Sequence, residues 1–107
     1  MFTINAALLD ACVLAVLQKA DTCGYELTQN VKAVMDVSES TLYPVLRRLQ
    51  KDKLLQTYDE EVNGRNRRYY GVTKAGLKQL EVYKELWQDY KKNIDNILIG
   101  EKKDDKK

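Results

Sequence analysis

Two stretches near the middle of the sequence carry side chains that could bind a polyanion. Residues 38–53, SESTLYPVLRRLQKDK, combine hydroxyl groups with cations, and residues 64–70, GRNRRYY, place three arginines next to a glycine. Guanidinium, ammonium and hydroxyl groups hydrogen-bond to phosphate oxygens and to base edges. The chemistry indicated is the recognition of nucleic acid rather than the turnover of a substrate.

The positive charge of the chain is concentrated in the same region. The net charge of the 107 residues is only +2, but residues 41–80 carry nine Lys or Arg against four Asp or Glu. Residues 1–40 carry two against five. A local basic patch of this kind is typical of a surface that meets a polyanion.

The composition excludes several other kinds of site. The chain has no histidine, which excludes histidine-based triads and most zinc sites. Cys12 and Cys23 form no CxxC motif, so we expect buried thiols, with redox sensing at Cys23 as the alternative. We therefore expect no metal, no cofactor and no enzymatic activity. No Lys or Arg precedes the first apolar stretch, which contains Asp10, and no apolar run reaches ~18 residues. We therefore expect no signal peptide and a cytoplasmic protein without a membrane segment.

Hydrophobic periodicity predicts three helices, a hairpin and a final helix. The expected helices cover residues 5–19, residues 25–35 and a stretch that begins near Ser38–Ser40, with a turn at residues 21–24. Pro44 must lie near the start of the third helix, because it cannot donate a backbone hydrogen bond. The expected strands cover residues 54–59 and 67–73, joined by a turn at residues 62–64. Thr73 is expected to cap the final helix.

The first and the last helices carry more apolar surface than one small domain needs. The first is apolar almost all round, so it must be covered on more than one side. The last carries an apolar seam with alternating spacing of three and four, formed by Leu80, Tyr83, Trp87, Tyr90, Ile94 and Ile97. Both features predict a homodimer in which the last helix is the dimerisation element.

The third helix offers a polar face beside an apolar stripe. Its candidate DNA-binding residues are Ser38, Ser40, Thr41, Tyr43, Pro44, Arg47, Arg48 and Lys51. Hydroxyl groups in the first turns suit base edges, and the later cations suit the phosphate backbone or a guanine edge. The alternative is an ordinary amphipathic helix whose basic residues are solvated.

The hairpin supplies a second set of candidate DNA contacts, namely Asn63, Gly64, Arg65, Arg67 and Arg68. In the alternative, these arginines pair across the strands with Asp59, Glu60 and Glu61. The expected fold is mainly α with a β-hairpin wing, an α+β winged helix-turn-helix with a long C-terminal helix. We expect the DNA-binding domain over residues 1–73, the dimerisation helix over 74–99 and a disordered tail over 100–107.

Three motifs resemble those of PadR-family transcriptional regulators. They are GYEL at residues 24–27, TLYPVLRRL at residues 41–49, and RRYY with TKAG within residues 67–76. The resemblance covers about residues 5–98, and the single final helix is similar to that of the small members. It implies a homodimeric winged-helix repressor on a dyad-symmetric operator, with the third helix in the major groove and the wing on the backbone. The family often has a glycine where Lys53 stands.

The resemblance also implies a candidate small-molecule site. In some small PadR-like proteins, tryptophans from the two final helices face each other across a pore and stack on flat cationic or aromatic compounds. Trp87 occupies the matching place, Leu14 is a further candidate, and Asp10 could supply a counter-charge. In the alternative, Trp87 packs in the apolar seam and Tyr83 fills the space.

Two functions of different classes follow. The first is a homodimeric, sequence-specific repressor, relieved by a small aromatic or cationic compound. The second is a dimeric winged-helix module that binds other proteins and has no specific affinity for DNA.

Overall fold

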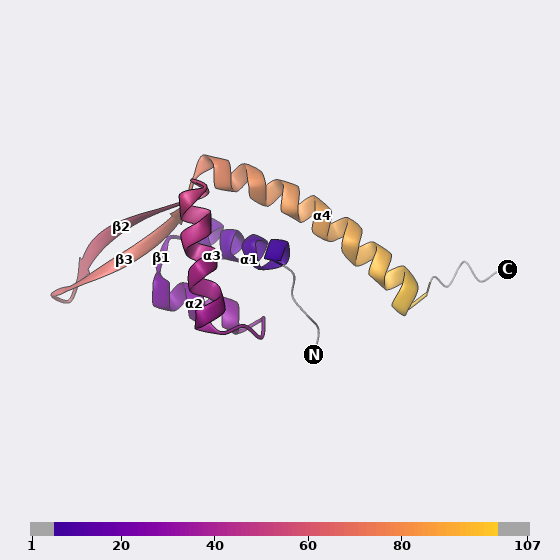
Figure 1. Ribbon diagram of the computed structural model, residues 1–107, viewed down its shortest axis with the longest axis horizontal. Helices are drawn as coiled ribbons and strands as arrows, with labels where there is room; N and C mark the ends of the chain where they lie inside the picture. Colours follow the sequence, from indigo (N-terminus) through magenta and orange to yellow (C-terminus); the bar gives the residue numbers. More distant parts are fainter. Residues whose placement is uncertain (1–5, 101–107) are drawn as a thin grey trace.

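The chain folds into a helical bundle with a hairpin on one side and a long helix on the other (Figure 1). This computed structural model describes residues 6–100. The described helices are α1 (Ala6–Lys19), α2 (Gly24–Lys32), α3 (Glu39–Lys51) and α4 (Lys74–Leu98), and the strands are β1 (Thr22–Cys23), β2 (Leu55–Val62) and β3 (Arg65–Val72). Except for Gly100, the tail expected over residues 100–107 lies outside the described residues, as does Asn5, the expected start of the first helix.

Helix α1 lies at the centre of the hydrophobic core. It contacts α2, α3, α4 and β3. The buried hydrophobic residues of the protomer form one cluster, which consists of Leu9, Val13, Leu14, Leu17, Leu27, Val31, Met35, Leu42, Leu46, Leu49, Leu55 and Leu80. Full burial of one such side chain stabilises the fold by roughly 1.5–3 kcal/mol. One protomer therefore covers much of α1 but leaves Ala7 exposed and Leu8 and Ala11 half-buried, so cover of that side by a partner subunit stays a prediction.

Helix α3 begins where the sequence predicted. Ser38 is the N-cap, with extended backbone, and its Oγ accepts a hydrogen bond from the Thr41 N–H at 3.3 Å. Leu42, Leu46 and Leu49 are buried on one side, as the apolar stripe predicted. Pro44 lies inside the helix and removes one backbone donor near its start, where the chain is exposed.

The end of α3 explains why a glycine would suit position 53. Lys53 adopts a left-handed conformation with φ of 64°. The Lys53 N–H donates to the Gln50 carbonyl, and the Leu54 N–H donates to the Leu49 carbonyl, both at 2.9 Å. This Schellman arrangement favours glycine at its left-handed position, so Lys53 holds a conformation that most side chains disfavour.

The sheet differs from the expectation in two ways. The prediction of a simple turn over residues 21–24 is wrong for Thr22 and Cys23, which pair with Tyr70 and Tyr69 as a third antiparallel strand in the order β1-β3-β2. A strand of two residues is too short to show periodicity. The β2–β3 hairpin is also longer than predicted, because the charged residues beside the turn continue the ladder.

The hairpin turn consists of two residues. Asn63 and Gly64 have φ of 54° and 78°, as a type I′ turn requires. Val62, which we expected in the turn, is the last residue of β2 and pairs with Arg65. The tight turn keeps the wing narrow and brings Arg65 to its tip.

Helix α4 is anchored at its start and extends away from the core. The Thr73 Oγ1 accepts from the Gly76 N–H at 3.0 Å and donates to the Lys53 carbonyl at 2.8 Å. Leu80, expected in the dimer seam, is instead buried in the core of the protomer. Beyond Tyr83 most of the helix is exposed, and the molecule is 67 Å long and 28 Å by 21 Å across. No helix within residues 6–100 is long and apolar enough to cross a membrane.

We predict that Gly76→Ala destabilises the fold, although alanine is intrinsically the better helix former by about 1 kcal/mol. A Cβ at position 76 would overlap the Leu54 carbonyl oxygen and lie 2.6 Å from Val72 Cγ2. Thermal unfolding should show a lower Tm than for the wild type. The matched control is Gly24→Ala at the start of α2, whose Cβ would meet only Tyr70 at 3.4 Å. A Tm raised by Gly76→Ala would show that the contact between α4 and Leu54 is looser than described.

Candidate nucleic-acid interface

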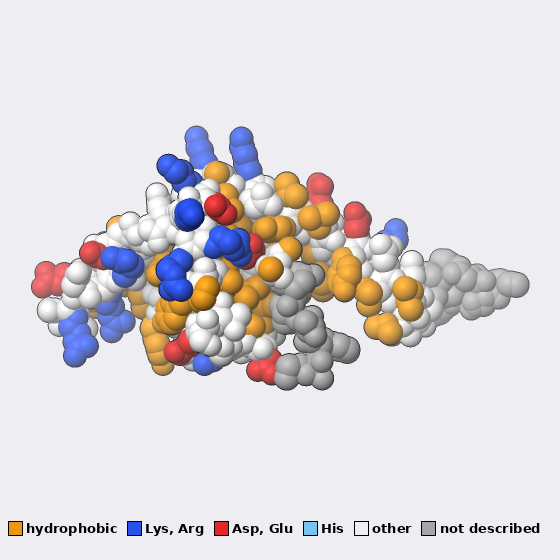
Figure 2. All heavy atoms as spheres, in the orientation of Figure 1, with side chains coloured by type: hydrophobic (Ala, Val, Ile, Leu, Met, Phe, Trp, Pro, Cys, Tyr) orange, Lys and Arg blue, Asp and Glu red, His pale blue; other side chains and the backbone are white. Residues whose placement is uncertain are grey.

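A groove lies where the wing meets the starts of α2 and α3. It has a volume of about 570 Å³ and is lined by Cys23, Gly24, Tyr25, Tyr43, Arg65, Asn66, Arg67, Arg68 and Tyr70. Figure 2 shows Lys and Arg side chains over α3 and along the wing, with acidic side chains near the wing tip. The two stretches singled out in the sequence therefore border one surface.

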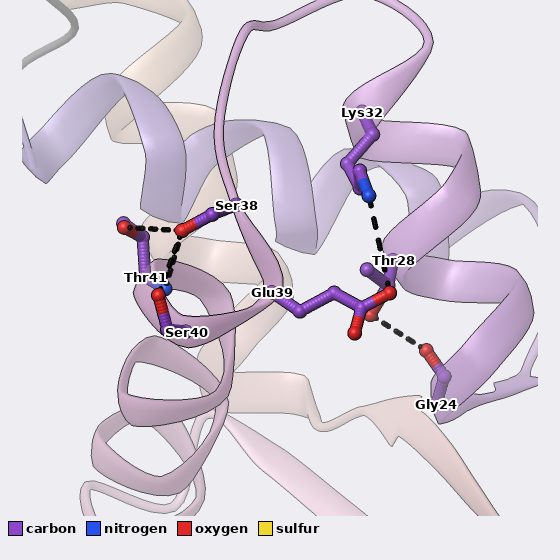
Figure 3. A network of polar contacts seen from close by, with 7 residues as sticks. All are labelled: Gly24, Thr28, Lys32, Ser38, Glu39, Ser40 and Thr41. Carbon is purple, nitrogen blue, oxygen red and sulfur yellow. Dashed lines mark hydrogen bonds and ion pairs between the residues drawn. The ribbon is translucent and has the colours of Figure 1, made fainter.

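The first turn of α3 presents three hydroxyl groups (Figure 3). Ser38 Oγ lies 2.9 Å from Ser40 Oγ and 3.1 Å from Thr41 Oγ1. The Ser38 hydroxyl is used to cap the helix, whereas Ser40 and Thr41 are exposed. Ser40 and Thr41 are thus the hydroxyl-bearing residues that can turn toward a ligand without uncapping α3.

The end of α2 and the start of α3 are joined by a polar contact (Figure 3). Lys32 Nζ of α2 lies 3.9 Å from Glu39 Oε2 of α3, and both side chains are partly exposed. Thr28 is buried and donates to the Gly24 carbonyl at 2.8 Å. The Lys32–Glu39 pair thus connects the two helices of the helix-turn-helix, whereas the Thr28 bond lies within α2.

The cations of α3 differ in what they contact. Arg47 and Lys51 are exposed and have no ion-pair partner within residues 6–100. Arg48 Nη2, by contrast, lies 2.6 Å from Asp10 Oδ1 of α1. The hydrogen bond that Arg48 donates to Asp10 raises the pKa of Arg48 above its ordinary value. Arg47 and Lys51 are available to a polyanion, whereas Arg48 is already engaged.

The wing arginines also differ from one another. Arg68 Nε lies 3.7 Å from Asp59 Oδ1 on the neighbouring strand, one of the cross-strand pairs considered from the sequence. Arg67 Nη1 donates to Cys23 Sγ at 3.8 Å. Arg65 is exposed and unpaired within the described chain. The cross-strand alternative thus applies to one of the three arginines.

The base of the wing is held by a hydrogen bond to the loop after α1. Tyr58 Oη of β2 donates to Asp21 Oδ2 at 2.7 Å, and the Tyr58 ring stacks on Tyr69 with centroids 5.8 Å apart. Gly71 leaves the space for this carboxylate, since a Cβ there would lie 2.8 Å from Asp21 Oδ1. The bond to Asp21 raises the pKa of Tyr58 to about 12.

Sequence reasoning missed several residues of the groove. Tyr25 is 63% exposed at the start of α2, and Tyr43, a predicted contact, is 38% exposed. Tyr25 belongs to the GYEL motif, but nothing in the spacing placed it beside the wing. Cys23 and Tyr70 reach the groove because β1 pairs with β3.

The two cysteines behave as separate thiols. Cys23 is buried, Cys12 is half-buried, and neither forms a disulfide. Burial raises the pKa of the Cys12 thiol, which lowers its reactivity. No group of three or more potential metal ligands occurs among the described residues.

A second cavity, of about 300 Å³, lies between α1 and α4. It is lined by Ala7, Leu8, Ala11, Tyr83, Leu86, Trp87 and Tyr90. Trp87 is therefore a lining residue, and its ring lies 6.3 Å from that of Tyr90. Leu14, a candidate from the sequence, is buried in the core instead, and Asp10 is engaged by Arg48 rather than free as a counter-charge.

The fold and the groove define a winged helix-turn-helix protein. Residues 13–82 match the transcriptional regulator PadR-like family, and the chain belongs to this family. Its members are transcriptional regulators rather than enzymes. The predicted fold class and the predicted family are both confirmed.

Solved structures of similar chains agree with this assignment. The protein smu.1704 from Streptococcus mutans is 39% identical, with a TM-score of 0.86 over 92% of this chain and 93% of that one. A PadR-like transcriptional regulator from Bacillus cereus is 35% identical, with a TM-score of 0.80 over 88% and 94%. A PadR family transcription regulator from Clostridium difficile is 30% identical, with a TM-score of 0.77 over 84% and 97%.

We predict that Tyr58 titrates near pH 12, well above the ordinary value of 10.0. Because its pKa is raised in the folded state, the bond to Asp21 stabilises the fold below pH 10, and this contribution is lost as the pH rises to about 12. The ¹³Cζ chemical shift of labelled Tyr58, followed against pH, reports the midpoint of its titration. Asp21→Asn should lower this midpoint. An unchanged midpoint in that variant would exclude Asp21 as the cause of the raised pKa.

Proposed function

We propose that this chain is a homodimeric, sequence-specific transcriptional repressor that binds a dyad-symmetric operator. The observation that carries the proposal is one continuous surface. The groove lined by Tyr25, Tyr43 and the wing arginines adjoins α3, the helix that also carries the exposed hydroxyl groups of Ser40 and Thr41 and the unpaired cations Arg47 and Lys51. The cations supply affinity for phosphate, and the α3 side chains supply the choice of bases. Because the partner is chromosomal DNA, we propose that the protein acts in the cytoplasm.

The proposed DNA contacts fall into two groups. We assign base reading to Ser40, Thr41 and Tyr43, with Ser38 and Pro44 shaping the start of α3. Backbone contacts are assigned to Arg47, Lys51 and the wing residues Asn63, Gly64, Arg65, Arg67 and Arg68. Arg65 is the strongest wing candidate, since it is the exposed arginine without a partner in the described chain.

The proposed dimer uses the exposed apolar side of α4. Trp87 and Tyr90 are 41% and 54% exposed, and Ile97 is 79% exposed. Apolar side chains repeated at this spacing are typical of a helix that packs against another helix. We propose Tyr83, Trp87, Tyr90, Ile94 and Ile97 as interface residues, with Leu80 supporting them from the core.

The cavity between α1 and α4 supports an effector site. Its lining is almost wholly apolar and includes three aromatic rings, which favours a flat aromatic compound. We propose that such a compound relieves repression. Because Asp10 is engaged by Arg48, the aromatic faces rather than this carboxylate would attract a cationic compound.

The proposal is tested by titrating the purified chain into DNA from its own upstream region at two salt concentrations. Unrelated DNA serves as competitor. Tight binding that resists the competitor and weakens steeply with salt is expected, because several phosphates are neutralised. If the affinity is weak, insensitive to salt and equal for both DNAs, the protein-binding module is the better reading.

We predict that the two groups of DNA contacts give different defects. Arg65→Ala should weaken binding to all sequences and reduce the slope of log K against log salt by about 1, as expected for one phosphate contact. Thr41→Ala should instead reduce the preference for the operator over unrelated DNA, because a base contact is worth about 1–3 kcal/mol of discrimination. Identical defects in both variants would contradict this assignment.

We predict that Trp87→Ala weakens dimerisation, measured by analytical ultracentrifugation over a dilution series. The change removes an exposed aromatic side chain from the centre of the seam. Lys92→Ala is the matched control, since it lies nearly opposite Trp87 on the same helix. A Trp87→Ala chain that remains fully dimeric would assign Trp87 to the cavity rather than to the interface.

A further inference from the structure

Asp10 is a carboxylate buried in the helical core. It is 4% exposed, and among residues 6–100 only Thr28 is a polar residue of comparable burial. Arg48 Nη2 of α3 donates to Asp10 Oδ1 of α1 at 2.6 Å. A charge at such a site requires an ionic partner, because desolvation is otherwise uncompensated. The pair therefore ties α3 to α1 at one defined point.

A third helix meets the same carboxylate. Tyr83 Oη of α4 lies 3.5 Å from Asp10 Oδ2, a long contact for a hydroxyl donor. Asp10 thus stands between α3, which borders the DNA-facing groove, and α4, which carries the exposed apolar seam. It is a direct polar connection between the two surfaces that the proposed function uses.

The angle between these helices matters for a dimer. Two recognition helices related by a two-fold axis read half-sites whose separation depends on how each helix is oriented relative to that axis. Apolar packing alone tolerates small rearrangements and loses uniqueness before it loses stability. An ion pair with a short, directed hydrogen bond permits a narrower range of helix orientations than apolar packing does.

We propose that Asp10 is a positioning residue that fixes the orientation of α3 through Arg48 and thereby sets the half-site separation that the dimer reads. This inference rests on the proposed function and adds to it. Arg48 then acts inside the protein, whereas its neighbour Arg47, unpaired in the described chain, acts on the DNA.

The test uses operators selected by the wild-type dimer from a random DNA pool, together with versions in which the half-sites are moved apart or together by one base pair. We expect the wild type to prefer the selected separation by at least tenfold. Arg48→Gln and Asp10→Asn should each reduce this preference several-fold, with the slope of log K against log salt unchanged. The matched control Arg47→Gln should reduce the slope of log K against log salt by about 1. It should leave the preference for the selected half-site separation unchanged.

A double variant separates a positioning role from simple loss of stability. Asp10→Asn with Arg48→Gln removes both charges, so no buried charge is left unpaired even if one single variant fails to fold. Because both residues act through one bond, the double variant should be no worse in half-site selectivity than either single variant. Arg48→Lys, which keeps the charge, should restore part of the selectivity. Circular dichroism and sedimentation confirm folding and dimerisation.

Two results would overturn the inference. The first is a reduced salt slope in Arg48→Gln with unchanged selectivity, which would make Arg48 a phosphate contact. The second is a double variant, folded and dimeric, that retains the wild-type preference for separation. If the wild type selects no sequence at all from the pool, the proposed function itself fails, and the inference fails with it. The wild-type selection is therefore done first.

Discussion

The burial of α1 is the constraint on which the rest of the structure depends. This helix is apolar almost all round, and within one protomer it contacts α2, α3, α4 and strand β3 of the sheet. Because all of these elements pack against α1, it fixes where they lie. Its one buried charge, Asp10, pairs with Arg48 of α3. This ion pair restricts rotation of α3 relative to α1, which contacts between leucines alone do not.

The wing depends on a different set of contacts. Its strands are joined by a two-residue turn, its base pairs with β1, and Tyr58 binds Asp21 from the loop after α1. The outer half of the hairpin carries charged side chains and contributes little to the core. Stability at the base and exposed cations at the tip suit an element that must reach a partner without losing its orientation.

Only part of the basic character of the chain is available to a partner. Arg48 and Arg68 are engaged by carboxylates, and Arg67 donates to a thiol, whereas Arg47, Lys51 and Arg65 are unpaired within residues 6–100. A cation paired with a buried carboxylate, as Arg48 is, cannot leave it without leaving that charge unpaired. The unpaired cations can exchange water for phosphate directly, whereas Arg67 and Arg68 are exposed but must first give up their own contacts.

The sequence by itself determined the order of the elements, the N-cap of α3, the apolar stripe of Leu42, Leu46 and Leu49, the Asn-Gly turn and the family, because caps, turns and periodicity are local properties. It did not reveal β1, whose two residues are defined only by their partner strand. It also treated Arg47 and Arg48 alike and assigned Leu14 to a ligand and Leu80 to the dimer seam. Those roles depend on which side of each helix faces the core, and only the tertiary structure decides that, because burial and ion pairing join residues far apart in the chain.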